Sequence, residues 1–222
     1  MNKIIKRAFD ILFSISVIML ITPILIPIMV ILRFSGEGNV FYVQQRVGKN
    51  KGHFGLIKFA TMLQDSSSLP GGDITTVGDP RVLKVGKYLR KTKINELPQF
   101  VNILLGDMSV VGPRQITYKN FNFYSQEIQD TIKNLKPGLT GIGSIVFRDE
   151  EQYIEKSDKE PLLFYKEDIA PYKGALEMWY SAKQQLLLDL LLIYTTVHVV
   201  LFPKSKIVNR LFKDLPKSEI FR

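Results

Sequence analysis

The sequence predicts an α+β fold, in which a membrane-embedded, re-entrant N-terminal helix hairpin precedes a compact, mainly helical domain with a small β-hairpin or sheet. Three observations lead to this prediction. An uncharged apolar run lies near the start of the chain, two short β-rich runs flank a glycine-containing loop after it, and apolar residues at helical spacing dominate the remainder. The 222 residues suffice for one buried core, and the absence of cysteine excludes disulfides and Cys-ligated zinc.

The N-terminal apolar run covers residues 11–32 without a single charge. As a straight helix its 22 residues would measure about 33 Å, just enough to cross the hydrocarbon core of a bilayer. Pro23 and Pro27 lie at its middle, where each removes a backbone donor, so they predict a kink. Thr22 is available to bond a carbonyl that Pro23 leaves free.

Basic residues flank this run on both sides. Lys6 and Arg7 precede it and Arg33 follows it. Because Lys and Arg prefer the cytoplasmic side of a membrane, a segment that enters and leaves one leaflet satisfies both flanks better than a crossing does. We therefore expect a re-entrant helix, with a spanning helix as the alternative.

The rest of the chain is typical of a compact domain. Residues 40–43 and 54–59 predict a hairpin around Gly48 and Gly52, and the Ser-, Gly- and Asp-rich residues 65–80 predict a loop. Apolar spacing predicts helices over residues 82–89, 96–105, 121–135 and parts of 149–168, followed by an apolar stretch over 186–202. Asn95 is a candidate N-cap for the second of these helices, and Gly106 is its expected end.

The chemistry concentrates between residues 79 and 114. Six positive charges lie between Arg81 and Lys93, and they favour a phosphate partner, although a solvated helix face would give the same pattern. Glu96 follows the cluster directly, and the glycine-punctuated turn 106–114 adds Asp107 and Arg114. Carboxylates beside clustered cations suit magnesium-bridged phosphate chemistry, because Mg²⁺ prefers oxygen ligands and keeps substrate phosphates in its shell.

These motifs together resemble the monotopic phosphoglycosyl transferases, bacterial sugar transferases that begin glycan assembly on a polyprenol phosphate. The resemblance covers nearly the whole chain. It is carried by "KRAFD" (6–10), the proline-broken apolar helix, "VFYVQQRVG" (40–48), "KFATM" (58–62), "DPRVLKVGKYLRKTKINELPQFVNILLGDMSVVGPR" (79–114) and "PGLTG" (137–141).

The resemblance implies an enzyme on the cytoplasmic face of the bacterial inner membrane, held in one leaflet by its re-entrant helix. It implies a nucleotide-sugar donor such as a UDP-sugar, a polyprenol phosphate acceptor and Mg²⁺. In that family the aspartate of an Asp-Glu pair attacks the β-phosphate, UMP leaves, and the covalent phosphosugar passes to the lipid. The implied catalytic residues are Glu96, Asn95 and Lys58, the implied phosphate-binding residues are Arg81, Arg90, Gln99 and Arg114, and the implied metal ligands are Glu96 and Asp107.

Three positions depart from the family pattern. The chain has Asn95 where the family has aspartate, Ala60 where it has arginine, and Gln115 where it has proline. Since a neutral amide has no anionic oxygen to attack phosphorus, the covalent mechanism does not transfer to Asn95. Four explanations remain open: a deliberate substitution that traps substrate, an inactive relative, a nucleophile moved to Glu96 or Asp107, and direct glycosyl transfer that releases UDP with Glu96 as general base.

The net charge of +9 is unevenly distributed along the chain. Residues 1–34, the expected membrane helix, carry +3, and residues 203–222, an expected basic amphipathic tail, carry +4, which leaves +2 for the expected catalytic domain of residues 35–202. The charged ends suit anionic lipid headgroups. A membrane-tethered module that recruits a protein or nucleic acid is the non-enzymatic alternative. The lack of basic strands interleaved with aromatic residues argues against nucleic acid, and homo-oligomerisation remains open.

Overall fold

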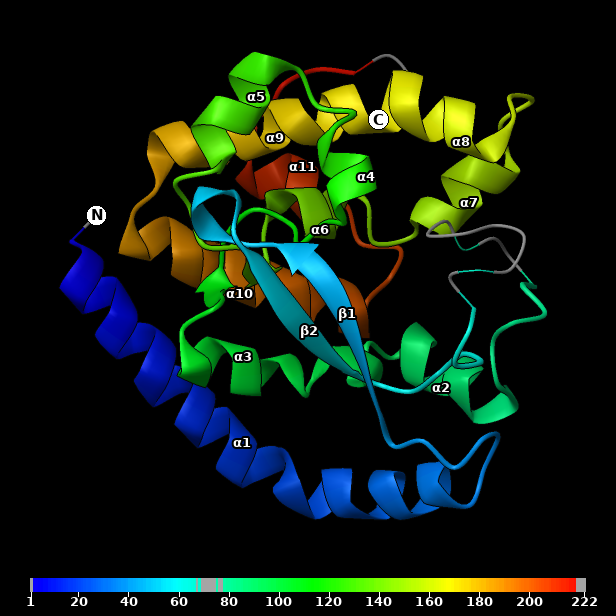
Figure 1. The fold of residues 1–222 in the computed structure, drawn as a ribbon. Helices are drawn as coiled ribbons and strands as arrows, with labels where there is room; N and C mark the ends of the chain where they lie inside the picture. The colour runs from blue at the N-terminus through cyan, green and yellow to red at the C-terminus, as the bar shows by residue number, and fades with distance from the viewer. Residues whose placement is uncertain (1, 67, 69–74, 76–77, 219–222) are drawn as a thin grey trace.

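The computed structural model describes residues 2–66, 68, 75 and 78–218, and it has an α+β architecture made mostly of helices (Figure 1). A long helix, α1 (Lys3–Arg33), runs along the outside of a domain that contains a two-stranded hairpin, β1 (Phe41–Val47) and β2 (His53–Phe59). The shorter α-helices are α2 (Lys84–Lys91), α3 (Gln99–Leu105), α4 (Tyr118–Phe121), α5 (Gln126–Ile132), α6 (Ile142–Val146), α7 (Glu150–Glu155), α8 (Pro161–Phe164), α9 (Ala170–Lys183), α10 (Leu186–Leu201) and α11 (Ile207–Leu211). The predicted fold class is confirmed at this level.

The predicted hairpin is present, and its first strand is longer than expected. β1 pairs antiparallel with β2, from Phe41 opposite Phe59 to Val47 opposite His53. The connecting turn, η1 (Lys49–Lys51), has Asn50 and Lys51 in the left-handed region at φ 57° and 60°. Because β1 alternates its faces, Tyr42, Gln44 and Arg46 share one side of the hairpin.

A second, parallel pair of strands joins two glycine-containing segments and was not predicted. β3 (Ser109–Val111) lies beside β4 (Gly138–Thr140), with Ser109 opposite Gly138. The backbones approach so closely that a Cβ on Gly112 would lie 2.4 Å from the carbonyl oxygen of Lys136, and one on Gly141 would lie 2.2 Å from that of Gly112. Glycine is therefore required where the two segments meet.

The predicted helices are found with shifted boundaries. The one expected over residues 96–105 begins at Gln99, because residues Ile94–Glu96 form a separate 3₁₀ turn, η2, and Pro98 takes the N-cap position. Asn95 is thus no helix cap, and its side-chain oxygen has no hydrogen-bond partner within the described ranges. Gly106 ends α3 in the left-handed conformation at φ 96°, as expected.

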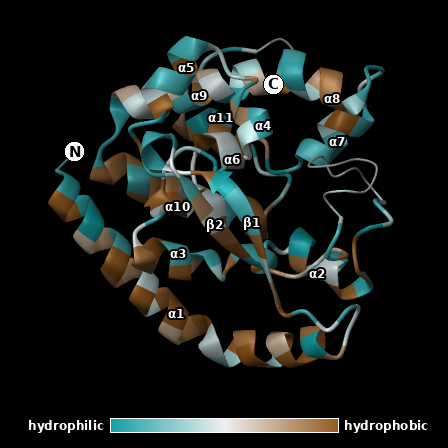
Figure 2. Ribbon diagram, in the orientation of Figure 1, coloured by the Kyte–Doolittle hydropathy of each residue, from teal (hydrophilic) through white to brown (hydrophobic). Residues whose placement is uncertain are grey.

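Helix α1 is continuous and bent, and its outer side is apolar. Figure 1 shows it descending past α3 and then turning below the domain, and Figure 2 shows it coloured as hydrophobic over most of its length. Among the described residues it is the one helix long and apolar enough to cross a membrane. Thr22 Oγ1 donates to the carbonyl of Ile18 at 2.6 Å. Thr22 therefore does not bond the carbonyl of Met19, which is the one that Pro23 deprives of an amide donor.

Polar residues at the start of α1 fix it to the domain. Lys6 forms an ion pair with the fully buried Asp189 of α10 at 2.6 Å and donates to the carbonyl of Val111. Arg7 donates to the carbonyls of Ile103 and Leu104 at the C-terminal end of α3, where a helix lacks amide donors of its own for its last carbonyls. The predicted membrane residues Lys6 and Arg7 thus make contacts within the protein.

The two ends of α1 contact the same domain. Asp10, which is 2% exposed, accepts hydrogen bonds from the Ser109 hydroxyl and the Val110 amide of β3. Near the other end, the fully buried Leu32 packs in a cluster with Phe59 and Leu89. The helix therefore lies along the domain from one end to the other, while its opposite side stays exposed.

The segment after α10 folds back on the domain. Phe212 is buried against Trp179 of α9, and Asp214 accepts a hydrogen bond from Trp179 Nε1 and pairs with Lys183. Tyr172 of α9 also donates to the carbonyl of Pro216. Residues 212–216 of the predicted tail thus contact α9. Residues 219–222 lie outside the described residues, as do 67, 69–74 and 76–77 of the predicted loop.

Candidate active site

A cavity of about 1210 Å³ opens between the hairpin, α2, η2, α7 and the C-terminal end of α10. The β1 side chains that share a face line one wall, and the end of β2 contributes Lys58. Asn95, Glu96, Arg114, Gln115 and Asn120 also line the cavity. Near α10 the lining becomes apolar at Leu201, which is 65% exposed.

Glu96 lies on the short turn η2, whose backbone the sequence shapes locally. Lys93, the residue before the turn, has a left-handed φ of 59° and ends the run that leads out of α2. The 3₁₀ turn then buries Asn95 and leaves Glu96 half-buried in the cavity wall. This turn is the reason that two adjacent polar residues both line the cavity.

Four cations act on the carboxylate of Glu96. They are Lys58, Arg114, Lys93 and Arg90. Burial alone would raise the pKa of Glu96, but these positive charges outweigh it and hold the pKa below its usual value. Glu96 is therefore an ionised carboxylate in a cationic cavity at neutral pH.

The pKa of Lys58 is also shifted, in the direction that favours its neutral form. Burial and the charge of Arg46 lower its pKa to about 7, although Glu96 opposes the shift. Its ammonium group is consequently only partly protonated near neutral pH. An added phosphate group would favour the charged form of Lys58, because it would supply the anionic partner that the surrounding arginines do not.

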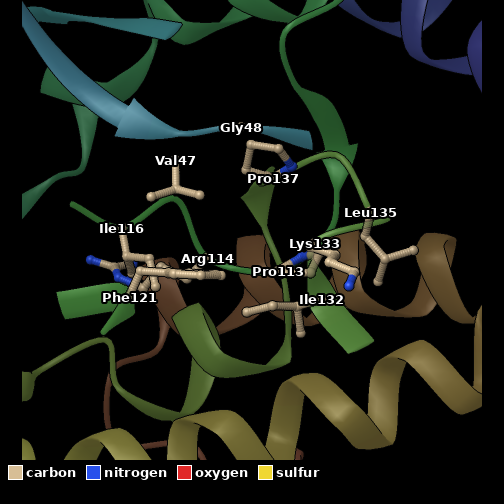
Figure 3. A pocket seen from close by; sticks show the side chains of 10 residues that line it. All are labelled: Val47, Gly48, Pro113, Arg114, Ile116, Phe121, Ile132, Lys133, Leu135 and Pro137. Carbon is tan, nitrogen blue, oxygen red and sulfur yellow. The ribbon is translucent and has the colours of Figure 1, made fainter. Parts of the chain in front are cut away.

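Arg114 is held by the close approach of β3 and β4. It follows the Gly112-Pro113 turn, forms a bridge with Gly138, donates its backbone amide to Glu177 and reaches the Ser144 hydroxyl at 3.2 Å. Figure 3 shows its side chain beside Phe121 and Ile116 at the edge of a second cavity. That cavity measures only about 20 Å³, room for a water molecule and far too little for a nucleotide.

Two predicted phosphate-binding residues are engaged elsewhere. Arg81 is buried, makes a close ion pair with Asp79 and donates to the carbonyl of Ser66. Gln99 is fully buried beneath Gln115, which donates to its side-chain oxygen at 3.1 Å, so Gln115 and not Gln99 lines the cavity. Arg81 stabilises the loop before α2 instead of lining the cavity.

The structure does not bring Asp107 to Glu96. The two residues follow and precede α3, at opposite ends of a seven-residue helix. Asp107 lies on the other side, next to Asn102, and it does not line the cavity. The predicted metal pair is therefore not assembled, and within the described ranges no group of three or more His, Asp or Glu residues could hold a metal ion.

A single-carboxylate magnesium site does fit the residues that are present. Asn95, which precedes Glu96 in the sequence, is 6% exposed, and its buried Oδ1 atom has no hydrogen-bond partner in the part of the chain that the structure describes. An amide oxygen and a carboxylate are oxygen donors of the kind that Mg²⁺ takes, and it commonly needs only one or two carboxylates when substrate phosphates complete its shell.

Other lining residues were missed in the sequence. Arg46 could have been found from the alternation of Tyr42, Gln44 and Arg46 along one strand. Lys173 gave no such signal, because it is a fully buried lysine that pairs with Glu150 from a distant helix. Of the three departures from the family pattern, Asn95 and Gln115 line the cavity, and Ala60 lies buried next to it.

The structure thus places a cationic cavity around an ionised glutamate, in a domain that carries a long apolar helix. The comparison with family models is more specific. Residues 1–203 match the model of the bacterial sugar transferases. The chain therefore belongs to the bacterial sugar transferase family.

Characterised relatives agree with this assignment. The chain is 32% identical over 199 residues to the UDP-N-acetylgalactosamine-undecaprenyl-phosphate N-acetylgalactosaminephosphotransferase of Aeromonas hydrophila, which covers 89% of this chain and 44% of the relative. It is 30% identical to the exopolysaccharide production protein ExoY of Sinorhizobium fredii, over 88% and 84% of the two chains. It is 36% identical to the UDP-glucose:undecaprenyl-phosphate glucose-1-phosphate transferase of Escherichia coli, over 71% and 34%. The chain thus spans less than half of two of these relatives and most of the third.

Proposed function

We propose that the protein transfers a sugar-1-phosphate from a UDP-sugar to polyprenol phosphate at the cytoplasmic face of the bacterial inner membrane, at the start of surface glycan assembly. The observation that carries the proposal is the ionised Glu96 among four cations in a cavity large enough for a nucleotide sugar. The activities for which the Aeromonas and Escherichia relatives are named support the donor and the acceptor.

Each charged residue has a definite task in this proposal. Arg90, Lys93 and Arg114 bind the diphosphate, because phosphate oxygens accept strong hydrogen bonds from charged donors. Lys58 takes up a proton as the diphosphate binds, since its pKa of about 7 leaves it partly neutral beforehand. Glu96 and Asn95 would hold Mg²⁺, which supplies charge neutralisation at the phosphates when it is bound.

The bond that breaks is the P–O bond between the two phosphates. An oxygen nucleophile attacks the β-phosphorus, and UMP leaves. Because Asn95 has no anionic oxygen, the attacking oxygen belongs to Glu96 or to the lipid phosphate itself. If Glu96 attacks, the lipid phosphate then attacks the same phosphorus, the P–O bond to Glu96 breaks, and the carboxylate is restored. The low pKa of Glu96 keeps its carboxylate ionised and therefore available for this step.

The contacts of α1 support a re-entrant membrane helix. Asp10 near its start and Leu32 near its end both pack on the same domain. A spanning helix would have to place these ends on opposite sides of the bilayer, with the domain between them. A helix that dips into one leaflet along its exposed apolar side requires no such arrangement.

Asn95 favours a second candidate function on the same scaffold. If the lipid phosphate attacks the sugar carbon C1 directly, the bond from C1 to the β-phosphate oxygen breaks and UDP leaves. This glycosyl transfer requires no carboxylate at position 95. Glu96 would then assist the acceptor as a general base.

The nucleotide product separates the two functions. The protein in phospholipid nanodiscs with undecaprenyl phosphate and Mg²⁺ is offered four UDP-sugars, namely the glucose, galactose, N-acetylglucosamine and N-acetylgalactosamine derivatives, and the released nucleotide is identified by chromatography. We expect UMP, whereas UDP would establish the second function and overturn the first. Glu96→Gln should abolish release in either case, and Asn95→Asp should raise UMP release if the first function holds. Release of neither nucleotide would contradict both.

A further inference from the structure

Two buried amides that line the cavity have side-chain oxygens without partners in the described part of the chain. Gln115 is 4% exposed and Asn120 is 8% exposed, and both line the cavity. Oε1 of Gln115 and Oδ1 of Asn120 are buried and have no hydrogen-bond partner among the residues that the structure describes. A buried polar atom without a partner costs stability, on the order of a lost hydrogen bond or more, so these atoms point to a ligand that pairs with them.

Neighbouring side chains fix the orientation of the two amides. Nε2 of Gln115 donates to Gln99, and the amide of Asn120 is hydrogen-bonded to the side chain of Tyr165. The nitrogen ends are thus occupied inside the protein and the oxygen ends remain for a ligand. Exchanging the oxygen and nitrogen positions in both Gln115 and Gln99 would keep their hydrogen bond and make Gln115 offer an N–H group to the ligand. A ligand group that both donates and accepts hydrogen bonds suits either orientation.

Hydroxyl groups meet this requirement and phosphates do not. A sugar hydroxyl donates to an amide oxygen and accepts from an amide N–H, whereas a phosphate oxygen only accepts and would be repelled by the amide oxygens. Gln115 directly follows Arg114, one of the cations around Glu96, so a neutral surface adjoins the cationic one. A nucleotide sugar has the same sequence of parts, a charged diphosphate joined to a neutral polyhydroxyl ring.

We propose that Gln115 and Asn120 form the subsite that binds the sugar hydroxyls of the donor and sets its sugar specificity. This proposal rests on the proposed function, because it takes the donor to be a UDP-sugar. Neither residue is assigned to the transfer step itself. The subsite should therefore affect which donor binds, and it should not affect how tightly the bare nucleotide binds.

Binding measurements with UDP and the four UDP-sugars test the subsite. Dissociation constants are measured by calorimetry for the protein in nanodiscs with Mg²⁺. We expect at least one UDP-sugar to bind more tightly than UDP. Gln115→Met and Asn120→Leu should each reduce that preference about three- to tenfold, the effect of one lost hydrogen bond, and leave the affinity for UDP within about twofold.

Matched substitutions at exposed neighbours provide the controls. Gln152→Met changes an exposed amide that lines the same cavity, and Asn122→Leu changes an exposed residue beside α4, so both should keep the wild-type preference. Asn120→Asp keeps the accepting oxygen and should keep the preference as well, which distinguishes a lost contact from a misfolded cavity.

Two results would overturn the subsite while leaving the proposed function intact. One is a wild-type protein that binds UDP and all four UDP-sugars equally. The other is an equal loss of UDP and UDP-sugar affinity in the Gln115 and Asn120 variants, which would place the uridine there instead of the sugar. If neither UDP nor any UDP-sugar binds, the proposed function fails, and the subsite fails with it.

Discussion

Lys58 is a cavity residue whose charge changes near neutral pH. Burial and Arg46 lower its pKa to about 7, so the free protein holds it charged below that pH and neutral above it. A charged ammonium binds the donor's diphosphate and a neutral amine does not, so binding should weaken as pH rises. Glu96 stays ionised throughout this range, because its own pKa is lowered below its usual value.

We therefore expect the dissociation constant for UDP-glucose to rise about tenfold between pH 6 and pH 8, following the protonated fraction of Lys58. UDP-glucose is the suitable probe, since its diphosphate does not titrate in this range. Calorimetry at half-unit pH steps measures the effect. In Lys58→Arg the charge is permanent, so the profile should become nearly flat. If the dissociation constant of Lys58→Arg depends on pH as steeply as that of the wild type, the effect belongs to another group. Lys93 is one such group, because burial lowers its pKa as well.

At the same scale, the structure brings some of the predicted site residues to one cavity and leaves others away from it. The predicted residues that line the cavity are Lys58, Arg90, Asn95, Glu96 and Arg114. Local charge density predicts Arg90, because five of the six cationic cluster positions lie on or beside a single short helix. Glu96 and Arg114 follow from their nearness to this cluster in the sequence, whereas Lys58 and Asn95 are implied only by the family resemblance. The sequence could not show that Arg81 and Asp107 lie away from the cavity. The position of the Arg81 side chain depends on its ion pair with Asp79, and that of Asp107 depends on the length of α3.

Among the elements, α1 depends on a few polar contacts to hold it against the domain. Lys6 pairs with Asp189, a fully buried carboxylate. Burial raises the pKa of Asp189 above its usual value, and the charge of Lys6 opposes that shift. Removing the lysine would leave that carboxylate without its cation. Breaking a buried pair in this way typically costs several kcal/mol.

Lys6→Met should accordingly lower the free energy of unfolding by about 3–5 kcal/mol, measured by chemical denaturation in detergent micelles. Lys6→Met with Asp189→Leu should recover much of the loss, because the double variant leaves no buried charge unpaired. Lys3→Met, at an exposed position one turn earlier on α1, serves as control and should change stability little. A loss in Lys3→Met as large as that in Lys6→Met would contradict a specific role for the pair.

Element prediction succeeded where the signal is local. The β1–β2 hairpin follows from two β-rich runs around nearby glycines, and the end of α3 follows from Gly106. The parallel pair β3–β4 escaped detection because its two three-residue strands are far apart in the chain and too short to show a period. The sequence feature that the pair requires is a set of glycines that let the two backbones approach closely, and hydrophobic periodicity does not detect glycines of this kind.

The molecule as a whole combines an apolar outer helix with a cationic cavity, and its membrane topology decides how the two work together. From sequence, length permitted a spanning helix and the prolines with the basic flanks favoured a re-entrant one. The structure adds a constraint that sequence could not supply: Asp10 and Leu32, near opposite ends of α1, pack on one domain. These contacts join residues that are far apart in the sequence, so only the tertiary fold reveals them.

Because the chain contains no cysteine, single cysteines report this topology cleanly. Lys3→Cys marks the start of α1 and Lys49→Cys marks the hairpin turn of the domain, and both positions are exposed. In spheroplasts treated with a membrane-impermeant maleimide we expect neither cysteine to react, and in permeabilised cells we expect both to react. Both ends then lie on the cytoplasmic side, as a re-entrant helix requires. Reaction of the Lys3 position alone in intact spheroplasts would instead show a spanning helix, and the contacts of Lys6 and Asp10 with the domain could not then exist in the membrane.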